Sequence, residues 1–193
     1  MFRRFTHPAG QDAQPAAPPP AAAATPPAPA GSAAETATAR QIVTRLDAMP
    51  PAEARYLACF AYVMSRAAQA DLSISAEESA LMERFAVEYG GLDEAQAVLV
   101  VGMTKLQASV EGATEDYVVT REFREISTME QRLQLLRCCF AVEAADGTIN
   151  AEEASVVNEI ARELDIERAD LNAVRDEFHE QLSSVQALRQ VGG

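Results

Sequence analysis

The chain has 193 residues, 29 of them acidic and 16 basic, which gives a net charge of −13. So large an acidic excess argues against nucleic acid and anionic membrane surfaces as partners, and it favours cations or basic protein partners. No apolar run reaches the length of a membrane helix, so we expect no integral membrane segment and a cytoplasmic location.

The chain begins with an Ala/Pro-rich stretch, and we expect residues 1–35 to form a disordered tail. Residues 11–34 are almost wholly Ala, Pro, Gly, Ser, Thr and Gln, and they offer too little apolar surface to offset the entropy lost on ordering. The basic and aromatic tip, Met1-Phe-Arg-Arg-Phe5, is either an ordinary start sequence or a short docking peptide for a partner groove.

Residues 36–188 have the pattern of an all-α domain, which we expect to be followed by a flexible C-terminus at 189–193. All ten prolines lie at or before Pro51, which suits a nearly all-helical fold. Capping residues and apolar periodicity predict a single compact bundle of seven or eight helices built from two similar halves, with no strand. In chain order the helices are expected at about 36–49, 51–70, 76–89, 94–109, 113–126, 129–145, 151–164 and 167–188.

An eight-residue acidic string occurs twice in the chain, with the two copies 75 residues apart. It reads Asp-Leu-Ser-Ile-Ser-Ala-Glu-Glu over residues 71–78 and Asp-Gly-Thr-Ile-Asn-Ala-Glu-Glu over residues 146–153. An apolar helix precedes each copy, and an amphipathic helix with matching apolar positions follows it. We therefore expect each half to consist of a buried helix, an acidic turn and an amphipathic helix packed on that buried helix.

Each copy has the pattern of a helix start with a capping box. Ser75 and Asn150 stand at the N-cap, and Glu78 and Glu153 stand three residues later, where a carboxylate reaches back to the amide of the cap. This structural role alone is one explanation of the string. It leaves four acidic residues without a function: Asp71, Glu77, Asp146 and Glu152.

The other explanation is cation binding. Residues 146–153 resemble the second half of an EF-hand loop, but Val142 and Ala144 stand where the first half would supply carboxylates, so we expect a shallower oxygen site. Gly147 permits a tight turn and makes the second copy the better candidate. The candidate ligands for a divalent cation, Ca²⁺ or Mg²⁺, are Asp146, Thr148, Asn150, Glu152 and Glu153, and in the first copy Asp71, Glu77 and Glu78.

Two apolar helices, each leading through Ala-Asp-(Gly)-x-Ile-[Ser/Asn]-x-Glu-Glu into an amphipathic helix, resemble the TerB-like (tellurite resistance protein B-like) family. The matching segments are residues 70–89 and 145–164. The resemblance implies an all-helical cytoplasmic domain with an acidic surface and no enzymatic activity. It also implies a metal-binding or protein-interaction role in stress response. Leu72 replaces the glycine of the motif in the first copy, which counts against a site there.

The chemistry-bearing residues outside the two strings do not indicate an enzyme. The expected domain holds a single histidine, His179, and no Gly-rich phosphate loop or Ser/His/Asp set. Asp176 precedes that histidine by one helical turn, which we interpret as a solvated surface pair. The cysteines are expected to be reduced, and Cys138 and Cys139 are either core residues or include a thiol sensor.

Two functions therefore remain open. The first is a non-enzymatic stress-response module whose acidic turns bind a divalent cation or a basic protein partner, with a link to tellurite or metal resistance. The alternative is a scaffold or adaptor protein that recruits a partner through its N-terminal tip and flexible arm.

Overall fold

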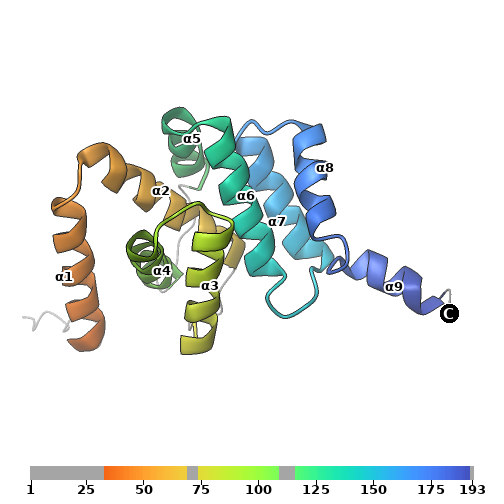
Figure 1. Cartoon of the computed structure of the whole chain (residues 1–193), viewed down its shortest axis with the longest axis horizontal. Coiled ribbons are helices and arrows are strands. Elements are labelled where there is room, and N and C mark those ends of the chain that lie inside the picture. The colour runs from red at the N-terminus through yellow and green to blue at the C-terminus, as the bar shows by residue number, and fades with distance from the viewer. Residues whose placement is uncertain (1–32, 69–73, 109–115, 192–193) are drawn as a thin grey trace, which may run out of the picture. The chain divides into compact units, whose positions relative to one another are not determined.

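The computed structural model of the chain describes residues 33–68, 74–108 and 116–191. These residues form nine α-helices and contain no strand, which confirms the expected all-α class (Figure 1). None of these helices is long and apolar enough to cross a membrane. The helices are α1 (Ala33–Asp47), α2 (Pro51–Ala68), α3 (Ala76–Glu88), α4 (Glu94–Ala108), α5 (Asp116–Ile126), α6 (Met129–Glu143), α7 (Ala151–Glu163), α8 (Arg168–Glu177) and α9 (Ser183–Val191).

The structure does not address the predicted N-terminal tail over most of its length. Residues 1–32, and with them the Met1–Phe5 tip and the adaptor role suggested for it, lie outside the described residues. The first residues described, 33–35, already belong to α1.

The helix starts follow the local capping signals in the sequence. Capping boxes are formed at Ser75, Thr128 and Asn150, at the starts of α3, α6 and α7. Asp93 accepts a hydrogen bond of 2.8 Å from the backbone amide of the third residue of α4. Pro51 is the first residue of α2, where its missing N–H has no intrahelical partner to lose. Side chains next to each helix start therefore determine where these helices begin.

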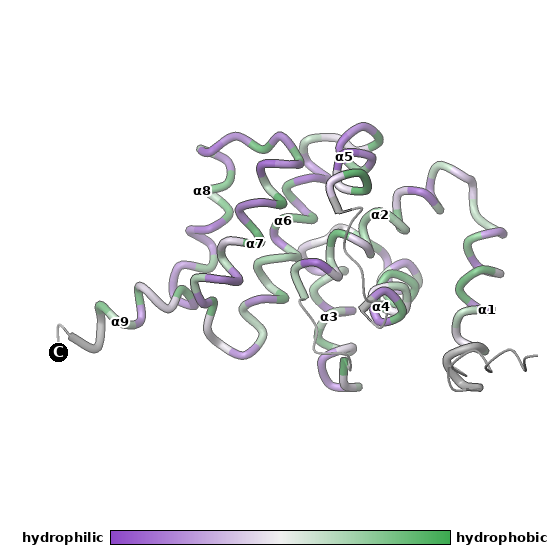
Figure 2. The backbone as a smooth tube through the Cα atoms, turned by 180° about the vertical axis from the view of Figure 1, so that it is seen from behind, coloured by the Kyte–Doolittle hydropathy of each residue, from purple (hydrophilic) through white to green (hydrophobic). Residues whose placement is uncertain are grey.

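The two apolar helices, α2 and α6, are buried, as the duplicated pattern predicts, and they lie against each other within the core. On α2 the side chains of Leu57, Phe60 and Met64 are fully buried, and on α6 Leu136 and Phe140 are fully buried. The outer helix α8 is mostly hydrophilic along its length and buries only Val174 (Figure 2). The two central helices therefore contribute much of the hydrophobic stabilisation, and the buried residues of α4, among them Leu99 and Val100, add to it.

A buried ion pair connects three of these helices. Arg66 of α2 donates a hydrogen bond of 2.6 Å to the Glu163 carboxylate of α7 and one of 2.7 Å to the Thr120 hydroxyl of α5. The two charged side chains are 11% and 6% exposed, so their pairing offsets a large desolvation cost.

The two halves do not pack alike. In the second half α7 packs on α6, as predicted, and it also contacts α2 and α5. In the first half α3 packs chiefly on α4 and α6, so the prediction that it would pack mainly on α2 is wrong. The helix that packs extensively on α2 in this half is α4.

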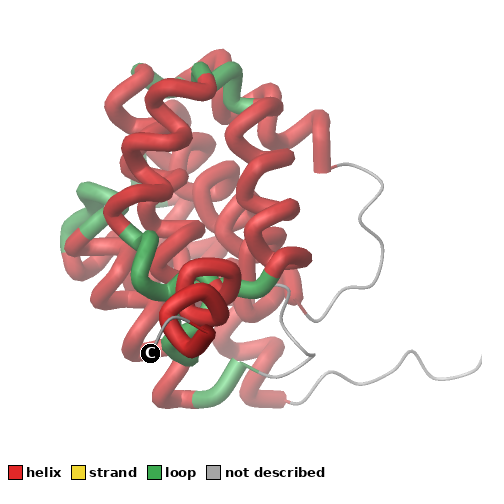
Figure 3. The backbone as a smooth tube through the Cα atoms, turned by 90° about the vertical axis from the view of Figure 1, so that its right-hand side faces the viewer, coloured by secondary structure: helices red, strands yellow, loops and turns green. Residues whose placement is uncertain are grey.

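The C-terminal part also differs from the prediction of one helix over residues 167–188. The chain forms α8 and α9 instead, separated at residues 178–182 (Figure 3, where α9 lies nearest the viewer). The backbone amide of Ile149 donates to the Gln181 carbonyl at 2.7 Å, and the Ser183 amide donates to the Ile149 carbonyl at 2.9 Å. These bonds form an isolated parallel bridge between Ile149 and Leu182, next to the turns at residues 178–181. The second acidic turn therefore interrupts the last helix.

Candidate functional site

The second copy of the acidic string forms a tight turn between α6 and α7. Gly147 has a φ of 93°, a left-handed conformation that favours glycine. Next to it, the Asp146 carboxylate accepts a hydrogen bond of 2.9 Å from the Thr148 amide. This local Asx-type bond holds the carboxylate of Asp146 over the turn.

The capping box of α7 occupies the other end of this turn. The side-chain oxygen of Asn150 accepts from the amides of Glu152 and Glu153 at 2.8 and 3.0 Å. In return, one carboxylate oxygen of Glu153 accepts from the Asn150 amide at 2.7 Å. The structural explanation of Asn150 and Glu153 is therefore confirmed, although a carboxylate has a second oxygen that this bond does not use.

The described part of the first copy, residues 74–78, forms a helix cap. The Glu78 amide donates to the Ser75 hydroxyl at 3.1 Å, and the Glu78 carboxylate accepts from the Ser75 amide at 2.7 Å. The bond from the Ser75 backbone lowers the pKa of Glu78. Glu77 is exposed in the first turn of α3. Asp71 and Leu72 lie outside the described residues, so a cation site in the first copy stays a prediction.

Glu143, at the end of α6, belongs to the second turn but escaped the sequence analysis. Glu143 is only 8% exposed, and its Oε1 atom has no hydrogen-bond partner among the described residues. Burial, followed by the nearby charges of Glu153 and Asp146, raises the pKa of Glu143 to about 8. A comparison of the two halves could have indicated Glu143, because the residue 75 positions earlier in the chain is Ala68, which carries no charge.

Gln186 of α9 contacts the same turn from the outside. Its Nε2 atom donates to the Gly147 carbonyl at 3.0 Å, and the Thr148 hydroxyl donates to its Oε1 atom at 3.2 Å. Thr148, one of the predicted ligands, is therefore held by a residue that the sequence analysis did not connect with the site.

The donor set is suited to a hard divalent cation. It consists of carboxylates and a hydroxyl, which are oxygen ligands that Ca²⁺ and Mg²⁺ prefer, and it offers no sulfur or imidazole for softer metals. Among the described ranges, no three His, Cys, Asp or Glu side chains form a ready-made metal cluster. The unpartnered oxygen of Glu143, beside Asp146 and Glu153, is the feature that fits a cation.

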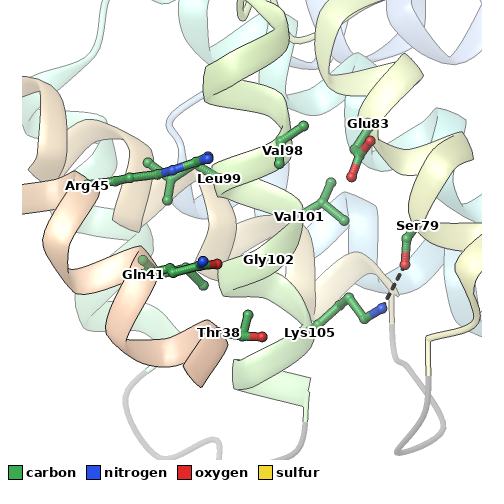
Figure 4. A pocket seen from close by; sticks show the side chains of 11 residues that line it. Thr38, Gln41, Arg45, Ser79, Glu83, Val98, Leu99, Val101, Gly102 and Lys105 are labelled. Atoms are coloured by element: carbon green, nitrogen blue, oxygen red, sulfur yellow. Dashed lines mark hydrogen bonds between the residues drawn. The ribbon is translucent and has the colours of Figure 1, made fainter. Parts of the chain in front are cut away.

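A shallow groove of about 230 Å³ lies between α1, α3 and α4 (Figure 4). It is lined by Arg45 and by Lys105, the only lysine of the chain, which donates a hydrogen bond of 3.0 Å to the Ser79 hydroxyl. None of the predicted cation ligands lines this groove, and its two basic side chains do not suit a cation.

The cysteines are core residues. Cys138 and Cys139 are fully buried, and the Cys138 sulfur lies 3.6 Å from the sulfur of Met64. Burial raises the pKa of Cys138 to about 12 and raises the pKa of Cys139 well above its ordinary value. Because a thiol sensor needs an accessible thiolate, the alternative prediction of a sensor at these positions is wrong. Asp176 and His179 are exposed on the surface, as predicted.

Comparison with known proteins identifies the family of the chain. The model of a family described as tellurite resistance protein TerB matches residues 56–176. This range begins in α2, ends in α8 and contains both copies of the acidic string, whereas α1 and α9 lie outside it. No curated protein and no solved structure matched the chain.

Proposed function

Because the chain belongs to the TerB family, we propose that it is a non-enzymatic module of tellurite or metal stress whose second acidic turn binds a divalent cation. The residues that would hold the cation are Glu143, Asp146 and Glu153, together with the Thr148 hydroxyl. Ca²⁺ suits these oxygens best, because it accepts an irregular set of six to eight ligands, whereas Mg²⁺ demands near-ideal octahedral geometry.

The single observation that supports this proposal is the buried carboxyl group of Glu143. A carboxylate removed from water without a partner is costly, and it takes up a proton unless a cation or a hydrogen-bond donor stabilises its charge. Glu143 takes no part in the capping box, and one of its oxygens has no partner within the described residues. Helix capping therefore accounts for Glu153 but not for Glu143, and a bound cation would account for both.

The proposal assigns one site to each chain. Ala68 stands where the second half has Glu143, so the first half lacks the buried carboxyl group. Ser75 and Glu78 complete a capping box there, which is a sufficient role for both. We therefore infer that the first copy is structural. Its exposed Glu77 interacts favourably with the positive end of the α3 dipole.

Isothermal titration calorimetry of the full chain with CaCl₂, MgCl₂ and ZnCl₂ tests the proposal. We expect a Ca²⁺ signal with one site per chain, and we expect Asp146→Asn and Glu143→Gln to weaken it at least tenfold. Glu77→Gln is the matched control from the first copy and should bind Ca²⁺ like the unmodified chain. The absence of heat at millimolar Ca²⁺, or equal binding by all variants, would contradict the proposal.

A basic protein segment bound at the same turn is a second candidate, favoured by the net charge of −13 and by the exposed Glu152. The Glu152 side chain takes no part in the capping box, so it is available to a basic side chain of a partner. Glu152→Gln should weaken binding of a lysine-rich peptide and leave Ca²⁺ binding unchanged. Peptide binding that is unchanged in Glu152→Gln, or Ca²⁺ binding that is weakened in it, would contradict this candidate.

A further inference from the structure

The side-chain amide of Gln186 has its orientation determined by its neighbours. Its Nε2 atom donates to two backbone carbonyls, that of Gly147 at 3.0 Å and that of Glu180 at 3.1 Å. Carbonyl oxygens only accept hydrogen bonds, so the amide nitrogen must face them and Oε1 must face the other way. Oε1 lies 3.2 Å from the Thr148 hydroxyl. The hydroxyl therefore has to donate its proton to Gln186.

This direction of donation matters for the turn. A hydroxyl has one proton and two lone pairs, and a cation coordinates only through a lone pair. With its proton directed toward α9, Thr148 has both lone pairs left for a cation. At the same time, the bond to the Gly147 carbonyl holds the left-handed residue of the turn in place.

The helix that carries Gln186 has few other attachments. No helix of the described chain packs extensively against α9, and Figure 1 shows it leading away from the helices around it. Its Leu188 is 74% exposed. Among the described residues, Ser183 and Gln186 join α9 by hydrogen bonds to the turn at residues 147–149, and Gln181, just before the helix, bonds to the same turn.

We propose that Gln186 is a positioning residue of the cation site, which orients the Thr148 hydroxyl for coordination and thereby couples cation binding to the ordering of α9. The inference rests on the proposed function. It goes beyond the family match, because α9 lies outside residues 56–176. Groups that orient metal ligands typically change metal affinity by about 10- to 100-fold when they are removed. Because coupling between two sites is reciprocal, a cation at the turn must also stabilise α9 against local opening.

The first test is a double-mutant cycle on the Ca²⁺ dissociation constant of the full chain. Gln186→Ala and Thr148→Val should each weaken binding about tenfold, and the double variant should bind no more weakly than either single variant, because one residue acts through the other. Ser184→Ala, an exposed change on the same helix, is the control and should leave affinity unchanged. Independent, additive losses would overturn the inference, and so would tighter binding by Gln186→Ala, since this would make Gln186 a competitor of the cation.

The second test measures hydrogen exchange of the amides at residues 184–191 with and without CaCl₂. Exchange in the unmodified chain should slow in Ca²⁺, and this protection should be lost in Gln186→Ala. Unchanged exchange in a chain that calorimetry shows to bind Ca²⁺ overturns the coupling alone. A chain that binds no Ca²⁺ overturns the proposed function, and this inference with it.

Discussion

Replacing Glu143 by Gln should remove a pH-dependent penalty that the buried carboxyl group imposes on folding. The side chain keeps its shape in this change and loses its ability to ionise. Glu143 lies at the end of α6 and is 8% exposed, so the folded chain opposes its ionisation whereas the unfolded chain does not. The free energy of unfolding of Glu143→Gln, relative to that of the unmodified chain, should therefore depend on pH in a defined direction.

The magnitude follows from the two pKa values, 4.5 as the ordinary value and about 8 in the folded chain. Between these values the unfolded chain has released the proton that the folded chain still holds, so stability decreases as the pH rises and changes little above pH 8. Since one pKa unit corresponds to about 1.4 kcal/mol, the unmodified chain should lose about 2 kcal/mol through this group between pH 5 and pH 7.

Urea denaturation followed by circular dichroism at pH 5, 6 and 7, in EDTA, measures this loss. The free energy of unfolding of Glu143→Gln minus that of the unmodified chain should increase by about 2 kcal/mol across the range. Glu152→Gln, an exposed change in the first turn of α7, is the control and should give a constant difference. A constant difference for Glu143→Gln as well would show that the folded chain does not hold this carboxyl group in its neutral form.

Three further predictions concern the turn, the ion pair and the thiols. Gly147→Ala should lower stability by about 1 kcal/mol in thermal denaturation because of its positive φ, although an added Cβ would meet no atom within 4 Å; an unchanged melting temperature would refute this. Arg66→Met should cost about 3 kcal/mol in urea denaturation, because it leaves Glu163 buried without its cation, and a cost below 1 kcal/mol would argue against the pair. Cys138 and Cys139 should react with a thiol reagent only when the chain unfolds; fast labelling of the folded chain would contradict their burial.

The helix starts could be predicted because their causes are local. Ser75, Thr128 and Asn150 each bond to amides within three residues, so a short stretch of sequence contains the whole interaction. The buried character of α2 and α6 was equally visible, since residues 56–70 and 133–145 are largely apolar.

The break between α8 and α9 could not be predicted in this way. Residues 167–191 contain no proline or glycine, and their pattern is that of one amphipathic helix. The break follows from backbone hydrogen bonds between Ile149 and residues 181–183, which are more than thirty positions away from Ile149 in the sequence. Only the tertiary arrangement shows that the second turn uses these backbone groups.

The candidate site was predicted in part. The string at residues 146–153 identified the turn, and the structure places Asp146, Thr148 and Glu153 around it. Glu143 was missed because a single acid at the end of an apolar helix is an unremarkable surface residue until packing buries it. The contrast with Ala68 at the matching position of the first half was the one available indication.

The central claim, that a divalent cation binds at the second turn and not at the first, is tested most directly by two-dimensional ¹H–¹⁵N NMR of the full chain during a Ca²⁺ titration. The largest saturable shifts should fall on the backbone amides of Gly147 and Thr148 and on the side-chain amide of Gln186, with the amide of Ser75 unmoved. Shifts centred on Ser75, or no saturable shift at millimolar Ca²⁺, would contradict the account.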